Sequence, residues 1–116
     1  MRKVGVAETD QDEWIEQKVS VYESHLQQCR LDFDNIAGQR GEAEAMKSPH
    51  AQGIAQYDHV VNALGDLLDE RDEDKYKSAL LRYAREAVSV LRDGNTPVWR
   101  RLAAATILEV LSDIPG

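Results

Sequence analysis

Apolar residues recur every three or four positions near the start of the chain, between residues 15 and 36. They alternate steps of four and three, in the order Ile15, Val19, Tyr22, Leu26, Cys29, Phe33 and Ile36. An average spacing of 3.5 residues keeps such side chains on one side of an α-helix, where they can face a second helix. The sequence therefore predicts a long first helix, over about residues 10–37, with a heptad seam along it.

Further helical patterns follow this segment. Ser48-Pro49 is typical of a helix start, with a capping serine and proline in the first helical position. From this start signal onward the sequence predicts helices over 49–69, 74–93 and 97–113, and just before it one helical turn over 42–47. Gly53, inside the second of the four long segments, either weakens that helix or lets another backbone approach closely. The last helix is apolar nearly all round, which predicts that it is the most buried.

No segment alternates between apolar and polar residues over the length of a strand. We therefore expect an all-α fold of about four helices, a compact bundle with a long N-terminal helix. A chain of 116 residues fits one domain, over 9–116, after a flexible arm of residues 1–8.

Composition and charge limit which binding partners and which cellular compartment we expect. The formal net charge is −7, and phosphate groups attract basic surfaces, so we expect no direct contact with nucleic acid. No apolar run approaches the length of a membrane span, and the first residues lack the apolar run of a signal peptide. The single cysteine rules out an internal disulfide. We expect a cytoplasmic protein that does not bind membranes.

Two interpretations of the seam remain open: it packs only on helices of its own chain, or part of it contacts another chain. Trp14 and Val21 lie beside the seam, seven residues apart on one face, and extra apolar residues there favour a second contact surface. Tryptophan is also enriched at binding hot spots. We expect this helix to bind a partner protein or to form a homodimer. The candidate interface comprises Trp14, Ile15, Val19, Val21, Tyr22, Leu26, Cys29 and Phe33.

Charge is spread unevenly along the chain. Residues 75–101 contain seven Lys or Arg residues and only two acidic residues, whereas the preceding part is strongly acidic. On the third long helix, the basic residues form a polar stripe that includes Lys75, Arg82, Arg85 and Arg92. This stripe is either a solvated face that balances the acidic helices or a candidate surface for an anion or an acidic partner.

Residues for catalysis or metal binding are sparse. Cys29 lies in the seam, where a cysteine usually behaves as a small apolar side chain. His25, His50 and His59 lack the spacings by which helices hold metals. We predict no catalytic residue, no metal site and no cofactor.

One acidic cluster supports an alternative. Asp12-Glu13-x-x-Glu16 resembles the first half of the acidic signature of the all-α nucleotide pyrophosphatases, which hold magnesium with carboxylates from two helices. The nearest second halves are Asp66-x-x-Asp69 and Glu70-x-x-Glu73, which lie far along the chain and partly in a turn. The first cluster also occupies the place where acids ordinarily stabilise a helix start.

The features together predict a non-catalytic regulatory protein that binds and sequesters a protein partner through an apolar helix face. Small acidic helical proteins of this kind neutralise, for example, a transcription activator, a toxin or a nucleic-acid-binding complex. The alternatives are a magnesium-dependent nucleotide pyrophosphatase and a structural subunit of a larger assembly.

Overall fold

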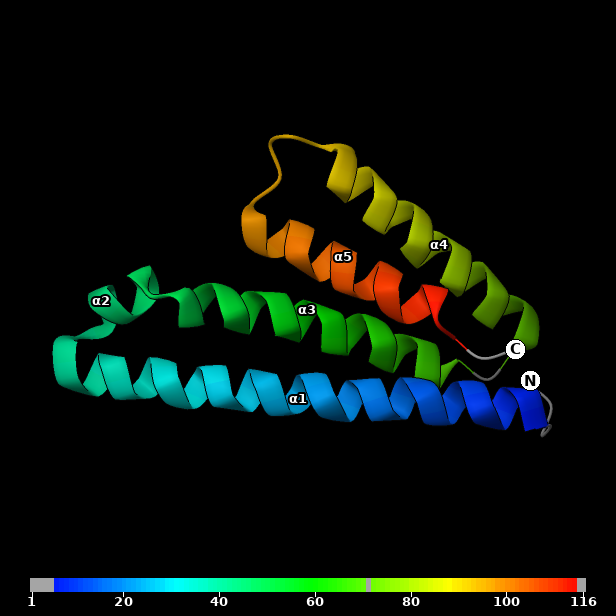
Figure 1. Ribbon diagram of the computed structural model, residues 1–116, viewed down its shortest axis with the longest axis horizontal. Helices are drawn as coiled ribbons and strands as arrows, with labels where there is room; N and C mark the ends of the chain where they lie inside the picture. The colour runs from blue at the N-terminus through cyan, green and yellow to red at the C-terminus, as the bar shows by residue number, and fades with distance from the viewer. Residues whose placement is uncertain (1–5, 71, 115–116) are drawn as a thin grey trace.

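The computed structural model describes the backbone of residues 6–70 and 72–114, and the side chains from residue 11 onward. These residues form five α-helices and no strand (Figure 1): α1 (Val6–Arg40), α2 (Glu42–Lys47), α3 (Pro49–Asp69), α4 (Glu73–Arg92) and α5 (Val98–Ser112). The all-α prediction is confirmed. The short α2 is the helical turn expected between the first two long helices.

The first helix is longer than predicted at both ends. It begins at Val6, so part of the expected arm is helical, and residues 1–5 of that arm lie outside the described residues. It also continues through Gly38 to Arg40, since one glycine lowers helix stability by only about 1 kcal/mol. Gly41 ends the helix instead: its φ of 94° is a conformation that other residues rarely adopt.

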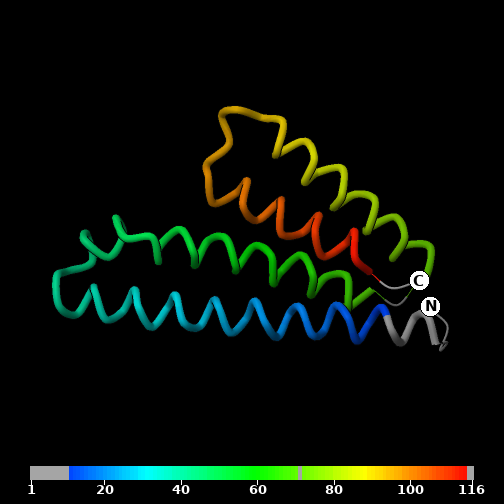
Figure 2. The backbone as a smooth tube through the Cα atoms, in the orientation of Figure 1, coloured from blue at the N-terminus to red at the C-terminus, as the bar shows by residue number. Residues whose placement is uncertain are grey.

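The long helices form two antiparallel hairpins. The first consists of α1 and α3, joined by α2, and the second of α4 and α5 (Figure 2). α5 packs against α3, so the helices follow one another across the molecule in the order α1, α3, α5, α4. The molecule measures 51 × 29 × 19 Å, and α1 sets the long dimension.

The main core lies where the first part of α1 meets the other three long helices. Ile15 of α1 and Leu64 and Leu67 of α3 are completely buried there. Tyr76 of α4 and Ile107 of α5 complete the same cluster. Away from this end the two hairpins diverge, and the second half of α1 packs on α3 and α2 alone.

The heptad seam of α1 faces α3 of its own chain. Ile15 is 0% exposed and Leu26 is 5% exposed, while the other seam residues are half-buried. The seam was predicted correctly as a helix-packing surface, and its main neighbour is intramolecular. None of the helices in the described part of the chain is long and apolar enough to cross a membrane.

Candidate protein-binding groove

An open groove of about 480 Å³ lies between the two hairpins, at the end where they diverge. Cys29 of α1 and Tyr57 of α3 form one side, and Leu102 of α5 forms the other. Gln52 and Gln56 of α3 supply polar groups to the same groove. We call this surface the α3–α5 groove.

Stacked rings hold the aromatic side of the groove. The Tyr57 ring stacks on Tyr22 with centroids 6.1 Å apart and on His25 with centroids 5.2 Å apart. Burial raises the pKa of Tyr22 above its usual value, and the nearby Glu109 carboxylate raises it further. Two α1 side chains therefore fix the orientation of Tyr57 in the folded chain.

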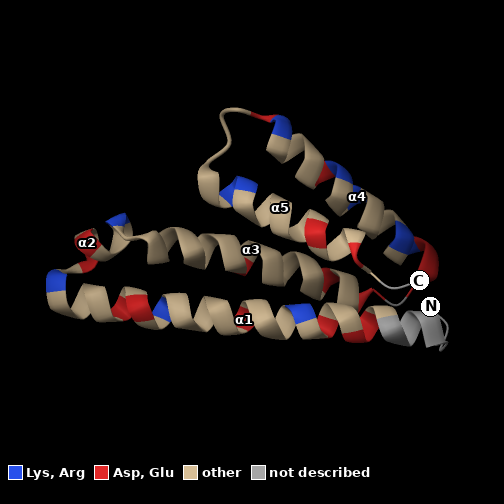
Figure 3. Cartoon of the chain, in the orientation of Figure 1, with Lys and Arg blue, Asp and Glu red and all other residues tan. Residues whose placement is uncertain are grey.

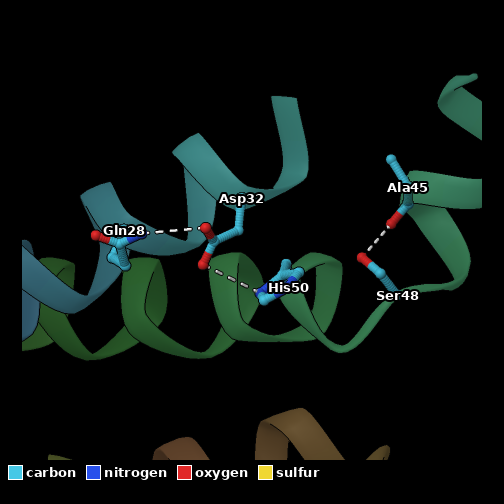
Figure 4. Close-up of polar contacts among 5 residues, drawn as sticks. All are labelled: Gln28, Asp32, Ala45, Ser48 and His50. Atoms are coloured by element: carbon cyan, nitrogen blue, oxygen red, sulfur yellow. Dashed lines mark hydrogen bonds and ion pairs between the residues drawn. The ribbon is translucent and has the colours of Figure 1, made fainter. Parts of the chain in front are cut away.

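Polar contacts fix the turn that leads into α3 (Figure 4). Asp32 of α1 lies between two partners: it accepts a hydrogen bond from Gln28 at 3.1 Å and lies 3.7 Å from His50 Nδ1. The hydroxyl of Ser48, which also lines the groove, donates to the Ala45 carbonyl at 2.6 Å. These contacts tie the start of α3 to α1 and α2.

The opposite side of the groove exposes large apolar side chains. Leu102 is 48% exposed, and Val98, one helical turn earlier on the same side of α5, is 62% exposed. The prediction that α5 is the most buried helix is wrong for this side. Its apolar pattern runs nearly all round, but α3 and α4 cover only the side that carries Ala103, Ala104 and Ile107.

A three-helix network positions α5 beside the groove. Arg100 lies two residues before Leu102, and its guanidinium contacts His59 Nε2 of α3 and Glu86 Oε1 of α4, both at 2.7 Å. Arginine can only donate, so His59 is neutral and accepts through Nε2. Burial lowers the pKa of His59, the Arg100 charge lowers it further, and Glu86 and Asp58 oppose this shift.

Trp14, the predicted interface anchor, makes its polar contact within the chain. Its indole Nε1–H donates to the Val110 carbonyl of α5 at 3.1 Å. Val110 lies in the last turn of α5, where carbonyls lack a partner within the helix, so Trp14 satisfies one of them. Lys18 lies over the same ring, 4.4 Å from its centroid.

The other candidate interface residues divide into three groups. Ile15 and Leu26 are buried and cannot reach a partner in the folded chain. Val19 and Phe33 are half-buried on the side of α1 that faces α3. The accessible members are Val21, which is 48% exposed, and the two that belong to the groove or its wall, Cys29 and Tyr22.

Tyr57, Leu102 and Val98 were not among the predicted interface residues. Tyr57 and Leu102 follow the apolar spacing of their helices, which is also the spacing of core residues. The signal for Val98 and Leu102 was the excess of apolar residues around α5, which is more than two neighbouring helices can cover.

Burial raises the pKa of the Cys29 thiol, which therefore stays protonated at neutral pH. Asp66, part of one proposed second half of the magnesium signature, accepts a hydrogen bond from Tyr83 at 2.8 Å. Among the described residues, no three His, Cys, Asp or Glu side chains gather closely enough to hold a metal ion.

The predicted basic stripe lies on α4, at the edge of the molecule away from the groove. Lys75, Arg82, Arg85 and Arg92 are all exposed. They lie away from the side of α4 that carries the buried Tyr76 and Ala87.

No known protein family matches the chain, and comparison with curated proteins and with solved structures gave no significant match. The α3–α5 groove and the apolar residues exposed beside it are therefore the grounds for a functional proposal.

Proposed function

We propose that the protein is a non-catalytic regulator that sequesters a protein partner by binding one of its amphipathic helices in the α3–α5 groove. The observation that carries this proposal is the exposure of Leu102 and Val98 beside a preformed groove. Large apolar side chains that lie together on a surface commonly mark a site of protein contact. The expected partner is a regulatory protein, such as a transcription activator or a toxin, whose own functional helix is covered by binding.

The overall dimensions support a protein partner. The chain has an accessible surface of 7390 Å², whereas a compact monomer of this size exposes about 6,400 Å². Its radius of gyration is 16.1 Å, compared with about 13 Å for a compact domain of this length. The divergence of the two hairpins contributes to both excesses, and a helix bound between them would cover part of the extra surface.

The chemistry of the groove suits a helix with one apolar face. Leu102 and Tyr57 would pack against apolar side chains spaced three and four residues apart. The amides of Gln52 and Gln56 can pair with polar groups at the margin of that face. Because stacking already fixes Tyr57, binding costs less side-chain entropy than it would with a mobile ring.

Two alternatives have less support. A nucleotide pyrophosphatase needs carboxylates from two helices around a shared magnesium ion, and the described acids do not form such a cluster. A structural subunit would form a permanent complex, whereas an open groove of this size suits a partner that binds and leaves.

The test is native co-purification from the source cell's lysate, followed by native mass spectrometry. We expect one partner at fixed stoichiometry, with crosslinks that map to α3 and α5. Leu102→Asp places a charge in the groove and should abolish capture. Leu81→Asp is the matched control, because Leu81 is 58% exposed and lies on α4, away from the groove.

The comparison of these two variants decides the proposal. Loss of capture with Leu102→Asp and retention with Leu81→Asp would support it, provided that both variants keep the helical circular dichroism of the parent. Equal capture by both variants would place the partner elsewhere. Recovery of a bare chain that hydrolyses nucleoside triphosphates with magnesium would favour the enzyme.

A further inference from the structure

The outer face of α4 carries a straight row of basic and hydroxyl side chains. The row keeps heptad spacing, so it stays on one side of the helix for its whole length. Every member is exposed, and they are Lys75, Ser78, Arg82, Arg85, Ser89 and Arg92. The lysine and the three arginines of this row form no ion pair among the described residues. Two other basic residues, Lys77 and Arg100, do form ion pairs. We call this row the α4 basic row.

The outer face of α1 carries a row of the same spacing and the opposite charge. Its members are exposed, and they are Glu13, Glu16, Ser20, Glu23, Gln27 and Asp34. Arg30 interrupts the row, but its guanidinium is paired with Asp58 of α3 at 3.8 Å. Within the part of the chain that the structure describes, the four acids of the row have no ion-pair partner. We call this row the α1 acidic row.

The two rows lie on the two outermost helices of the molecule. The starts of α1 and α4 meet where Tyr76 Oη donates a hydrogen bond to Gln11 at 3.0 Å. Beyond that contact α3 and α5 lie between α1 and α4, and no ion pair joins the two rows within the described residues (Figure 3). The α4 basic row spans about 26 Å and the α1 acidic row about 32 Å along their helices. The rows thus share their spacing, overlap over most of their length, and differ in the sign of their charge.

We propose that these rows are a self-association surface: α4 of one copy docks along α1 of the next. The contact joins two different faces, so it is heterologous and produces a closed ring or an open chain of copies. This self-association does not depend on the α3–α5 groove and goes beyond the proposed sequestering function.

A second copy fits the α4 basic row better than other polyanions do. The net charge of −7 repels nucleic acid and anionic membranes from the molecule as a whole. A second copy has the same net charge, but it presents a complementary row of matching spacing at an exposed edge. Exposed ion pairs each contribute little, so the association is weak and depends on concentration.

Sedimentation velocity on the full chain at increasing concentration tests the proposal. We expect the average mass to rise with concentration and to fall towards the monomer in about 1 M salt, where charges are screened. Glu16→Arg with Glu23→Arg reverses the acidic row, and Arg82→Glu with Arg85→Glu reverses the basic row. Each double variant alone should weaken association by about tenfold or more.

The two variants change the net charge in opposite directions. Reversal of the acidic row makes the chain less negative, which would strengthen association if net repulsion alone controlled it. An equimolar mixture of the two variants should associate again, because each then offers the row that the other needs. Arg40→Glu with Arg101→Glu, a matched charge change outside the rows, should leave association unchanged.

Several outcomes would overturn the proposal. A parent chain that stays monomeric at all concentrations would do so, as would a variant mixture that fails to associate although both variants are helical by circular dichroism. A dimer that both double variants leave intact would mean that copies meet through another surface. Binding of duplex DNA that only the basic-row variant loses would identify an anion site instead.

Discussion

The Sγ atom of Cys29 on α1 lies where a side chain at position 53 of α3 would begin. A β-carbon on Gly53 would be 2.7 Å from this sulfur, closer than side-chain atoms come in real structures. The glycine therefore allows α1 and α3 to approach closely beside the groove. Of the two roles expected for Gly53, the structure supports close approach.

This contact predicts that the effect of Gly53→Ala depends on residue 29. In the parent chain, alanine should lower the free energy of unfolding by about 1–2 kcal/mol, because the clash outweighs its better helix propensity. In a Cys29→Ala background the sulfur is gone, so the same change should raise stability by about 0.5–1 kcal/mol. Urea denaturation of the four proteins measures both effects, and an equal effect in the two backgrounds would contradict the contact.

The Trp14–Val110 hydrogen bond predicts a stability role for Trp14. Trp14→Phe keeps an aromatic ring but leaves a carbonyl at the end of α5 without its donor. We expect a loss of about 1 kcal/mol in the free energy of unfolding beyond the loss caused by the smaller ring. Trp99→Phe is the control, since the Trp99 indole donates no hydrogen bond within the described residues. Similar losses in both variants would argue against the role of this bond.

Local sequence patterns predicted the positions of the helices well. They predicted less well which helices pack against each other. The heptad spacing from Ile15 to Ile36 identified α1, and Ser48-Pro49 marked the start of α3 correctly. The spacing showed that a helix must cover the seam but could not show that α3 does so. The predicted end of the first helix near residue 37 was wrong because the next residue, Gly38, is tolerated inside a helix, whereas at Gly41 the backbone adopts a conformation that favours glycine.

The candidate groove was harder to predict, because it depends on the angle between two hairpins. Leu102 and Tyr57 have the same helical spacing as buried residues, and only the divergence of α5 from α3 exposes Leu102. The contact of Trp14 was hidden for a similar reason: Trp14 stands among acids in the sequence, but the fold brings the end of α5 to it. Contacts between residues 96 positions apart leave no local pattern.

Burial along α1 predicts opposite results for two aspartate substitutions. Leu26→Asp places a charge in a site that is 5% exposed and should destabilise the fold by several kcal/mol, enough to unfold much of the protein. Val21→Asp changes a residue that is 48% exposed and should shift the free energy of unfolding by no more than about 0.5 kcal/mol. Thermal unfolding followed by circular dichroism compares them. A stable Leu26→Asp variant that loses only association would mean that the seam serves another chain.

The His59–Arg100 contact predicts that the fold weakens in mild acid. The pKa of His59 is lowered in the folded chain, so the unfolded chain binds the proton more tightly. The contribution of neutral His59 to the free energy of unfolding is therefore complete above the pKa of histidine in the unfolded chain, about 6.5. This contribution is lost as the pH falls through the lower pKa of His59 in the folded chain. The charges that face His59 act in both directions: Arg100 disfavours the proton, while Glu86 and Asp58 favour it.

Urea denaturation between about pH 8 and pH 5 should show this loss in the parent chain. His59→Gln keeps an acceptor for Arg100 but cannot be protonated, so its free energy of unfolding should depend less on pH across this range. His50→Gln is the control, because His50 lies beside Asp32 at the other end of α3 and makes no contact with Arg100. NMR titration of the His59 ring supplies a direct check. A midpoint above about 6.5 would mean that the carboxylates outweigh Arg100 and burial, and the acid weakening would then have another origin.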